Sequence, residues 1–231
     1  MYNGGSQSTL YNIHFSGNSA GEFGGGLYNF SSHASLRNIT FSDNSALQRG
    51  GGIYNNLSNP SLTNVSISGN SAEHGGGMYN SENSNPGINN VTIFDNSATQ
   101  GGGIFNSYSN PTVLNSIVWG NAPDSITGSA ADVTYSVIQY GYIGLGNIDA
   151  DPLFGLPEEI PHFPIYPLLP GSPAIDAGNP DSSMCPPTDQ RGVNRPQDGD
   201  GDGRRICDIG AYEYINEDVE FELFFLPLIF K

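Results

Sequence analysis

The residues best suited to chemistry form an alternating run of aspartate and glycine, Asp198-Gly199-Asp200-Gly201-Asp202-Gly203. Carboxylates at alternate positions, with glycines between them for tight turns, can wrap a hard cation such as calcium, as in the first half of an EF-hand loop. The glutamate that closes such a loop is missing, because Ile209 stands at the twelfth position. Calcium binding by Asp198, Asp200 and Asp202 is therefore one interpretation, and a solvated acidic turn is the other.

Cys185 and Cys207 flank this run and are the two cysteines of the chain. In an exported protein they would form a disulfide that closes a loop of about 20 residues and contributes roughly 3 kcal/mol in the chain-entropy model. Two free thiols are the alternative. A zinc site is not indicated, because the chain has no CxxC pair and its four histidines are scattered.

Asp43 and Asp95 are weak candidates for catalysis. They occupy equivalent positions two repeats apart, so coils stacked about 4.8 Å apart would separate them by roughly 9.6 Å. Hydrolysis of glycosides needs two carboxylates at a comparable spacing. Gly17, Gly69 and Gly120 fill the same position in other repeats, which favours a tolerant turn. We predict a non-catalytic chain and keep a carbohydrate-active enzyme, of polysaccharide lyase or glycoside hydrolase type, as the alternative.

The elements that would position these residues are the strands of a repeat. Glycine triplets begin at Gly24, Gly50, Gly75 and Gly101, spaced 26, 25 and 26 residues apart. An aliphatic residue, an aromatic residue and an asparagine follow each triplet. About ten residues later a block such as Asn64-Val65-Ser66-Ile67 alternates apolar and polar residues. This period and alternation predict an all-β fold, a right-handed parallel β-helix (a solenoid) with an irregular C-terminal cap region.

Stacked coils align equivalent side chains in ladders about 4.8 Å apart. We expect one aliphatic ladder inside the stack and one amide ladder at a bend, where side-chain amides hydrogen-bond along the stack. The expected ladders are Leu27, Ile53, Met78 and Ile104, and Asn29, Asn55, Asn80 and Asn106.

The Gly-Gly-aliphatic-Tyr blocks, together with Phe15-Ser16-Gly17-Asn18 and Phe41-Ser42-Asp43-Asn44, resemble the repeats of polymorphic outer-membrane proteins. Those repeats form β-helical passenger domains, so the resemblance implies an extracellular or cell-surface module of a bacterial protein. Ile67, Ile93 and Val118 replace the phenylalanine in three copies, which keeps the core apolar.

Residues 112 to 214 resemble the C-terminal region of the choice-of-anchor Q proteins in the order and spacing of their motifs. Those are secreted bacterial β-helix proteins that differ in how they attach to the cell. The resemblance therefore implies export and attachment more than it implies an activity. The motifs are Gly146 to Phe154, Leu169 to Gly178, Asp189 to Gly192 and Asp208 to Tyr214.

These patterns divide the chain into coils of about 25 to 26 residues over 1–146, a cap region over 147–215 and a hydrophobic tail over 216–231. The tail is too short to span a bilayer. A sorting or attachment role and an extra strand over the end of the β-helix are both open for it.

Met1-Tyr2-Asn3 stands 26 residues before Leu27-Tyr28-Asn29, so the sequence begins within an incomplete coil. We expect a truncated chain, the C-terminal part of a longer protein whose export signal was lost with the upstream coils. A genuine start with an unusual cap is the alternative. An uncovered first coil would expose a sheet edge prone to end-to-end self-association.

The net charge of −16 belongs mainly to the C-terminal part. Residues 1–122 carry five acids and two bases, which leaves 18 acids and five bases for the remainder. Such an acidic chain would repel phosphate backbones, so nucleic-acid binding is excluded, and no apolar run is long enough for a transmembrane helix. The expected partners are cell-surface or environmental glycans, and calcium is the one cofactor that the sequence suggests.

Overall fold

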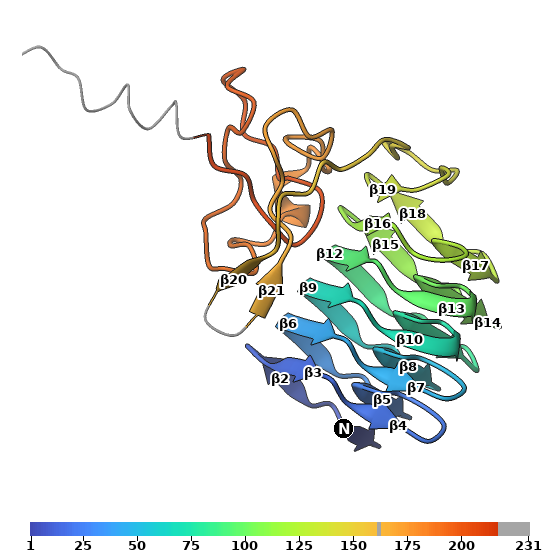
Figure 1. The fold of residues 1–231 in the computed structure, drawn as a ribbon. Coiled ribbons are helices and arrows are strands. Elements are labelled where there is room, and N and C mark those ends of the chain that lie inside the picture. The colour runs from blue at the N-terminus through green and yellow to red at the C-terminus, as the bar shows by residue number, and fades with distance from the viewer. Residues whose placement is uncertain (161–162, 217–231) are drawn as a thin grey trace, which may run out of the picture.

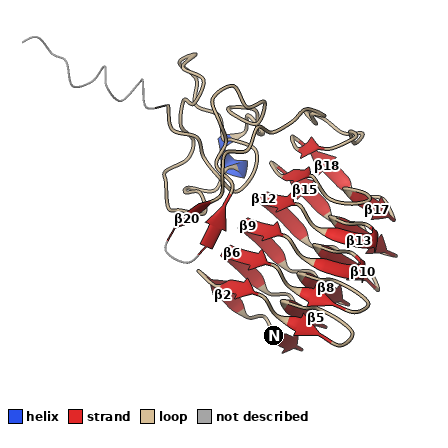
Figure 2. Cartoon of the chain, in the orientation of Figure 1, coloured by secondary structure: helices blue, strands red, loops and turns tan. Residues whose placement is uncertain are grey.

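The computed structural model describes residues 1–160 and 163–216. Parallel strands from successive coils stack into a solenoid, and an irregular C-terminal part lies beside it (Figure 1). Strands dominate the described part of the chain, which contains one short helical element (Figure 2). The predicted all-β parallel β-helix is confirmed.

The first sheet contains the segments that follow the glycine triplets, in the order β1-β5-β8-β11-β14-β17. Its register places Leu27 beside Ile53, as the repeat predicts. The alignment expected for the first residues is also confirmed, because Tyr2 pairs with Tyr28. The strands are β1 (Tyr2–Gly4), β5 (Leu27–Phe30), β8 (Ile53–Asn56), β11 (Met78–Ser81), β14 (Ile104–Ser107) and β17 (Ile126–Gly128).

The second sheet is the longest and carries a bend in every coil. In five coils the bending residue is an asparagine with positive φ, for example Asn38 at 52° and Asn64 at 54°, and in the last coil it is Tyr135 at 46°. Asparagine tolerates this left-handed conformation better than most residues. The strands are β2 (Thr9–Tyr11), β3 (His14–Ser16), β6 (Ser35–Ser42), β9 (Ser61–Ser68), β12 (Gly87–Phe94), β15 (Thr112–Leu114), β16 (Ile117–Trp119), β18 (Asp132–Thr134) and β19 (Val137–Ile138).

The third sheet is short and leads into the glycine triplets. Gly50 has a φ of 66°, and a Cβ added to Gly51 would lie 2.4 Å from the carbonyl oxygen of Ser71. The triplet therefore combines a left-handed turn with a close approach between coils that a side chain would block. The strands are β4 (Ser19–Ala20), β7 (Ser45–Ala46), β10 (Ser71–His74) and β13 (Ser97–Gln100).

The hydrophobic core runs along the inside of the stack. Phe15 stacks on Phe41 with ring centroids 4.9 Å apart. Ile67, Ile93 and Val118 continue the same column and are fully buried. The change from phenylalanine to branched aliphatic residues therefore keeps the column apolar along the stack.

The last coil is covered by residues 139–150. Ile148 accepts a hydrogen bond from the backbone N–H of Ile138 at 2.9 Å and donates one to the carbonyl of Ser136 at 2.9 Å. This segment, which the predicted boundary at 146 divides, covers the end of the stack. It does so with backbone pairing that continues the solenoid.

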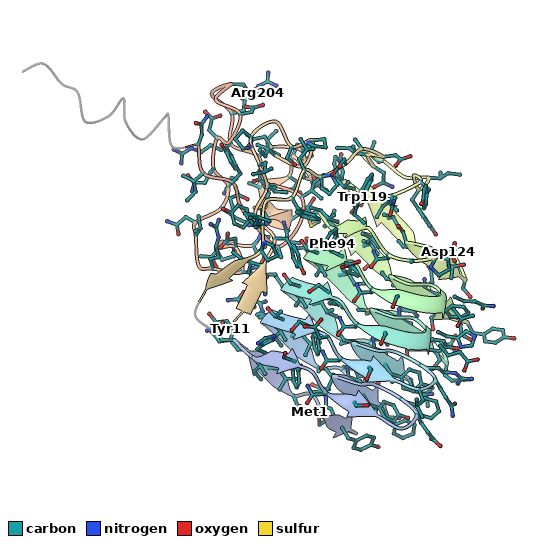
Figure 3. All side chains as sticks on the ribbon, in the orientation of Figure 1. Met1, Tyr11, Phe94, Trp119, Asp124 and Arg204 are labelled. Carbon is teal, nitrogen blue, oxygen red and sulfur yellow. A yellow bond between two sulfur atoms is a disulfide. The ribbon has the colours of Figure 1, made fainter. Side chains whose placement is uncertain are left out.

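Residues 151–160 and 163–216, here called the lateral region, lie along the side of the stack next to β6, β9 and β12 (Figure 1). The region therefore lies beside the coils, and residues 139–150 cover the end of the stack. The tip of the region, at Arg204, lies far from Met1 in the first coil (Figure 3). Of the predicted tail over 216–231, all but Asn216 lies outside the described residues. The elements are β20 (Glu158–Ile160), β21 (Phe163–Ile165) and the 3-10 helix η1 (Ser182–Met184).

Candidate functional site

Asp43 and Asp95 occupy a turn that requires a left-handed backbone. Their φ angles are 55° and 54°. Glycine and, less readily, aspartate adopt this conformation, which explains why the two residue types alternate along the column. The column is completed by Gly17, Gly69 and Gly120, with φ angles of 62°, 65° and 67°.

The ladders expected from the sequence form continuous columns. Leu27, Ile53, Met78 and Ile104 align in one register and are fully buried. The amide ladder is linked by hydrogen bonds from each side-chain NH2 to the side-chain oxygen of the next coil. These bonds join Asn29 to Asn55, Asn55 to Asn80 and Asn80 to Asn106, each at 2.9 Å.

A second amide ladder, which we did not anticipate, runs through the Asn-Ser-Ala motifs. The side-chain oxygen of Asn70 accepts hydrogen bonds from both the backbone N–H and the side-chain NH2 of Asn44, each at 2.9 Å. Asn96 receives the same pair of bonds from Asn70. The recurrence of this asparagine in five coils was the signal for it. The ladder consists of Asn18, Asn44, Asn70, Asn96 and Asn121.

The lateral region docks on the asparagines that bend the second sheet. The side-chain NH2 of Asn64 donates to the carbonyl of Thr188 at 2.7 Å, and that of Asn90 donates to the carbonyl of Asp208 at 3.0 Å. The side-chain oxygen of Asn115 accepts from the backbone N–H of Asn179 at 2.7 Å. Bend residues of three successive coils therefore hold the lateral region.

Hydroxyl groups beside the bends complete the docking. Gln190 donates to Thr40 Oγ1 at 2.9 Å and accepts from Ser66 Oγ at 2.6 Å. The backbone N–H of Ala211 donates to Thr92 Oγ1 at 3.0 Å. These hydroxyls occupy the same place in three successive repeats. The neighbouring residues in the sequence do not show that their partners lie more than 100 residues away.

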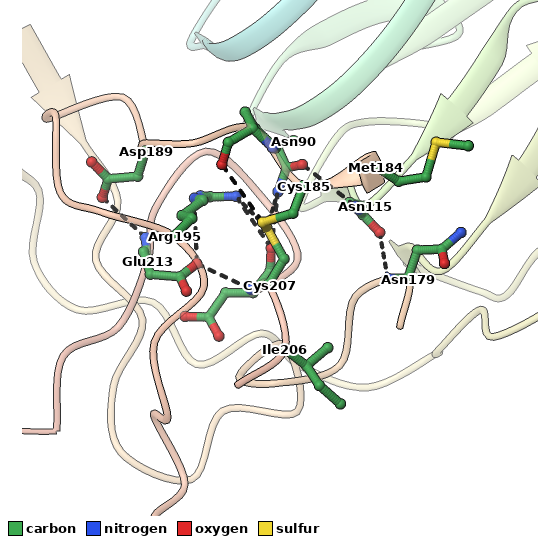
Figure 4. Close-up of a disulfide and its surroundings, with 12 residues drawn as sticks. Asn90, Asn115, Asn179, Met184, Cys185, Asp189, Arg195, Ile206, Cys207 and Glu213 are labelled. Carbon is green, nitrogen blue, oxygen red and sulfur yellow. Dashed lines mark hydrogen bonds and ion pairs between the residues drawn. A yellow bond between two sulfur atoms is a disulfide. The ribbon is translucent and has the colours of Figure 1, made fainter. Parts of the chain in front are cut away.

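A buried cluster of charged residues holds the lateral region together. The side chains of Arg195 and Glu213 are fully buried, and Arg195 Nε lies 3.3 Å from Glu213 Oε2. Arg191 pairs with the buried Asp189 at 2.8 Å. Asp208 accepts hydrogen bonds from two backbone N–H groups, those of Asp176 and Tyr214. Figure 4 shows Asp189, Arg195 and Glu213 next to the disulfide.

Burial dominates the acid–base properties of this cluster. It raises the pKa of Glu213 from 4.5 to about 7, although the neighbouring charge of Arg195 acts in the opposite direction. Burial also raises the pKa of Asp208 well above its usual range, and the nearby Glu213 raises it further. Desolvation penalises each charged form, so the cluster favours retaining a proton.

The disulfide between Cys185 and Cys207 is confirmed. It spans 22 residues and lies against the stack, where Asn90 and Arg195 approach Cys207 (Figure 4). The disulfide therefore links two segments of the lateral region close to the charged cluster.

The Asp/Gly loop brings together a different set of carboxylates from the predicted one. Oxygens of Asp176, Asp198 and Asp200 lie within 4.8 Å of one another, whereas Asp202 is not part of this group. Asp176 accepts hydrogen bonds from the backbone N–H groups of Gly199 and Asp200, each at 2.8 Å. Asp176 is 22 residues upstream in the sequence, so the alternating pattern alone did not reveal it.

The fold and its ladders define a parallel β-solenoid built from glycine-rich coils. Within it, residues 12–29 and 38–56 match the family model of the Chlamydia polymorphic membrane protein repeat. The matched segments contain Phe15 and Phe41, and the coils with an aliphatic residue at that position lie outside the match. These repeats point to a surface-associated β-helix module. No curated protein and no solved structure matches the chain.

No helix among the described residues is long and apolar enough to cross a membrane.

Proposed function

We propose that the chain is a non-catalytic extracellular or cell-surface β-helix module, a stalk or adhesin that contacts glycans. The observation that carries this proposal is that the recurring polar residues of the coils already have structural roles. Their asparagines form ladders or hold the lateral region, and Asp43 and Asp95 occupy a left-handed turn. The repeat match to polymorphic membrane proteins supports a surface location.

The experiment is to incubate the purified chain with a glycan array and with soluble polysaccharides. Retention on glycans with no shorter products is the expected result. Release of oligosaccharides would contradict the proposal and favour the alternative, a carbohydrate-active enzyme. In that case the double variant Asp43→Asn, Asp95→Asn tests whether these two carboxylates are catalytic. Activity that survives both changes would exclude them as catalytic residues.

We further propose that residues 112–214 form an attachment module of the choice-of-anchor Q type. Three of the four motifs behind this resemblance lie apart in sequence but meet at the buried charged cluster, where hydrogen bonds link Asp176 to Asp208, Asp208 to Glu213 and Glu213 to Asp189. Support would come from a cell-fractionation experiment in which a reporter fused to this chain stays with the cell surface. Equal release of the reporter with and without residues 112–214 would contradict it.

Calcium binding by the Asp/Gly loop is proposed on the geometry of Asp176, Asp198 and Asp200. Added calcium should then raise the melting temperature of the full chain, and Asp200→Asn should abolish the rise. Asp202→Asn is the matched control, since Asp202 lies outside the group. An unchanged melting temperature of the unmodified chain would end the proposal.

End-to-end self-association is proposed for the first coil. Strands β1, β2 and β4 are the last in their sheets, and each pairs with one neighbour; Thr9 lies on β2. Exposed edges of this kind recruit further strands, and lysines at an edge prevent it. Thr9→Lys should therefore reduce dimer formation in sedimentation velocity, whereas Leu47→Lys, on an exposed site of the second coil, should not. A monomer at all concentrations would contradict the proposal.

A further inference from the structure

Two shallow depressions adjoin at the end of the stack that is remote from the first coil. One is lined by Asn85, Tyr108 and Asn110, the other by Tyr140 and Tyr142, and Ala130 belongs to both. Their volumes are about 540 and 660 Å³. Together they form one continuous surface, here called the tyrosine groove.

Hydrogen bonds to one short segment fix the two halves of the groove. The backbone N–H of Tyr108 donates to Ser129 Oγ at 3.1 Å, and the phenol oxygen of Tyr142 accepts from the backbone N–H of Ala131 at 2.9 Å. Residues 129–131 therefore tie the loop of Tyr108 to the loop of Tyr140 and Tyr142. The relative placement of the two loops is therefore set by the fold.

The two most exposed tyrosines of the groove are not required by packing. Tyr108 and Tyr140 are 81% and 76% exposed, and both have positive φ, at 51° and 70°. A bulky side chain is unfavourable in this conformation, so the backbone does not favour tyrosine at these positions. The column that contains Tyr108 accepts Ser31, Leu57 and Glu82 in earlier coils, so the fold does not select an aromatic residue there.

The lining of the groove is neutral. Within the described part of the chain, aromatic and amide side chains line it and no charged side chain does. Tyrosine presents a flat apolar face with a polar tip, and asparagine both donates and accepts hydrogen bonds. A sugar ring offers the complementary surfaces, an apolar C–H face and a rim of hydroxyls. An anionic polymer would find no positively charged side chain among the described residues that line it.

We propose that the tyrosine groove binds an uncharged oligosaccharide, whose rings stack on Tyr108 and Tyr140 and whose hydroxyls bond to Asn110 and its neighbours. This site rests on the proposed glycan-contacting function and gives it a location and a ligand class. It lies on turns at the end of the stack, not along a strand face.

The test uses the full chain and four neutral hexasaccharides, of β-glucan, xylan, mannan and chitin type, with binding measured by calorimetry and saturation-transfer NMR. We expect one or more of them to bind, and Tyr108→Ala and Tyr140→Ala each to weaken binding by roughly tenfold. Tyr108→Phe should retain most of the affinity because it keeps the ring. Tyr2→Ala, a 64% exposed tyrosine of the first coil, is the matched control and should bind normally.

Other outcomes separate the site from the function. Undiminished binding by the Tyr108→Ala, Tyr140→Ala double variant would show that the glycan binds elsewhere than in the tyrosine groove. The proposed glycan-contacting function would still stand. Binding of none of the four probes would overturn the ligand class, and a dimer lost in the same double variant would assign the groove to a second copy. Shorter products in the calorimeter cell would overturn the non-catalytic function itself.

Discussion

The coils and the lateral region are stabilised in opposite ways. In the coils the ladder contacts are repeated, so the bond from Asn29 to Asn55 recurs from Asn55 to Asn80. In the lateral region each contact is unique and joins distant parts of the chain, as between Asn90 and Asp208, 118 residues apart. Repetition spreads the free energy of folding over many equivalent bonds. The lateral region instead depends on a few buried charges, one disulfide and a small apolar cluster that includes Leu168, Ala174 and Ile209.

The largest effect is expected when the buried ion pair is broken. Arg195→Met leaves Glu213 buried without its cation, which costs about 3–5 kcal/mol. The lateral region should lose protection from hydrogen exchange while the coils keep theirs. Arg204→Met, at an exposed site, is the control and should change neither. An equal loss of protection in the coils would show that the two regions are one cooperative unit.

Removal of the disulfide should come next. Without the bond between Cys185 and Cys207 the lateral region loses about 3 kcal/mol, because a loop of this length is no longer closed in the unfolded chain. The double variant Cys185→Ala, Cys207→Ala is unfolded in urea to measure both regions. The near-ultraviolet signal of the lateral tyrosines monitors the lateral region, and hydrogen exchange monitors the coils. A shift confined to the coils would refute the comparison.

The pH dependence of stability should also differ between the regions. Glu213 has a folded pKa of about 7, above its ordinary 4.5, so the folded state holds its proton more tightly than the unfolded state does. Its contribution is therefore complete below about pH 4.5 and is lost as the pH rises through 7. Between pH 5 and 8 the lateral region should lose about 2 kcal/mol.

The charged groups that face Glu213 are Arg195, Asp189 and Asp208. Melting curves of the unmodified chain and of Glu213→Gln across this pH range measure the effect. Because the neutral amide cannot lose a proton, the variant should have a flatter pH profile and lose less stability as the pH rises to 8. A profile as steep as that of the unmodified chain would assign the dependence to another group.

The smallest effect is expected for a single coil position. Asn70→Ala removes the acceptor of two hydrogen bonds from Asn44 and should cost about 1–3 kcal/mol. Asn18→Ala, at the exposed end of the same ladder, should cost less, because Asn18 donates to its neighbour and supports no earlier coil in the described structure. Chemical denaturation of both variants compares them, and equal losses would argue against the ladder.

The sequence predicted the coils well because their information is local and repeated. The period placed Leu27 beside Ile53 and Tyr2 beside Tyr28, and both alignments are found in the structure. The exchange of glycine and aspartate at Asp43 predicted a tolerant turn, in agreement with its positive φ. The disulfide between Cys185 and Cys207 was also predicted correctly.

The sequence could not place the lateral region, since its partners are set by tertiary contacts. Nothing near Gln190 indicates that it meets Thr40 and Ser66 on the side of the stack. Likewise, Asp176 joins the Asp/Gly loop from outside the alternating pattern. Residues with unrepeated, long-range partners have no period from which their positions could be read.

The side-on docking also limits how such a protein can grow during evolution. A solenoid lengthens by duplication of whole coils, and each added coil moves everything beyond it by about 4.8 Å. The lateral region contacts the stack from Thr40 to Asn115, and these contacts match the present spacing of the coils. A coil inserted between these points would pull bonded partners apart, whereas a coil inserted before Thr40 would leave them in place. Length variation among homologous chains should therefore accumulate on the side of the first coil.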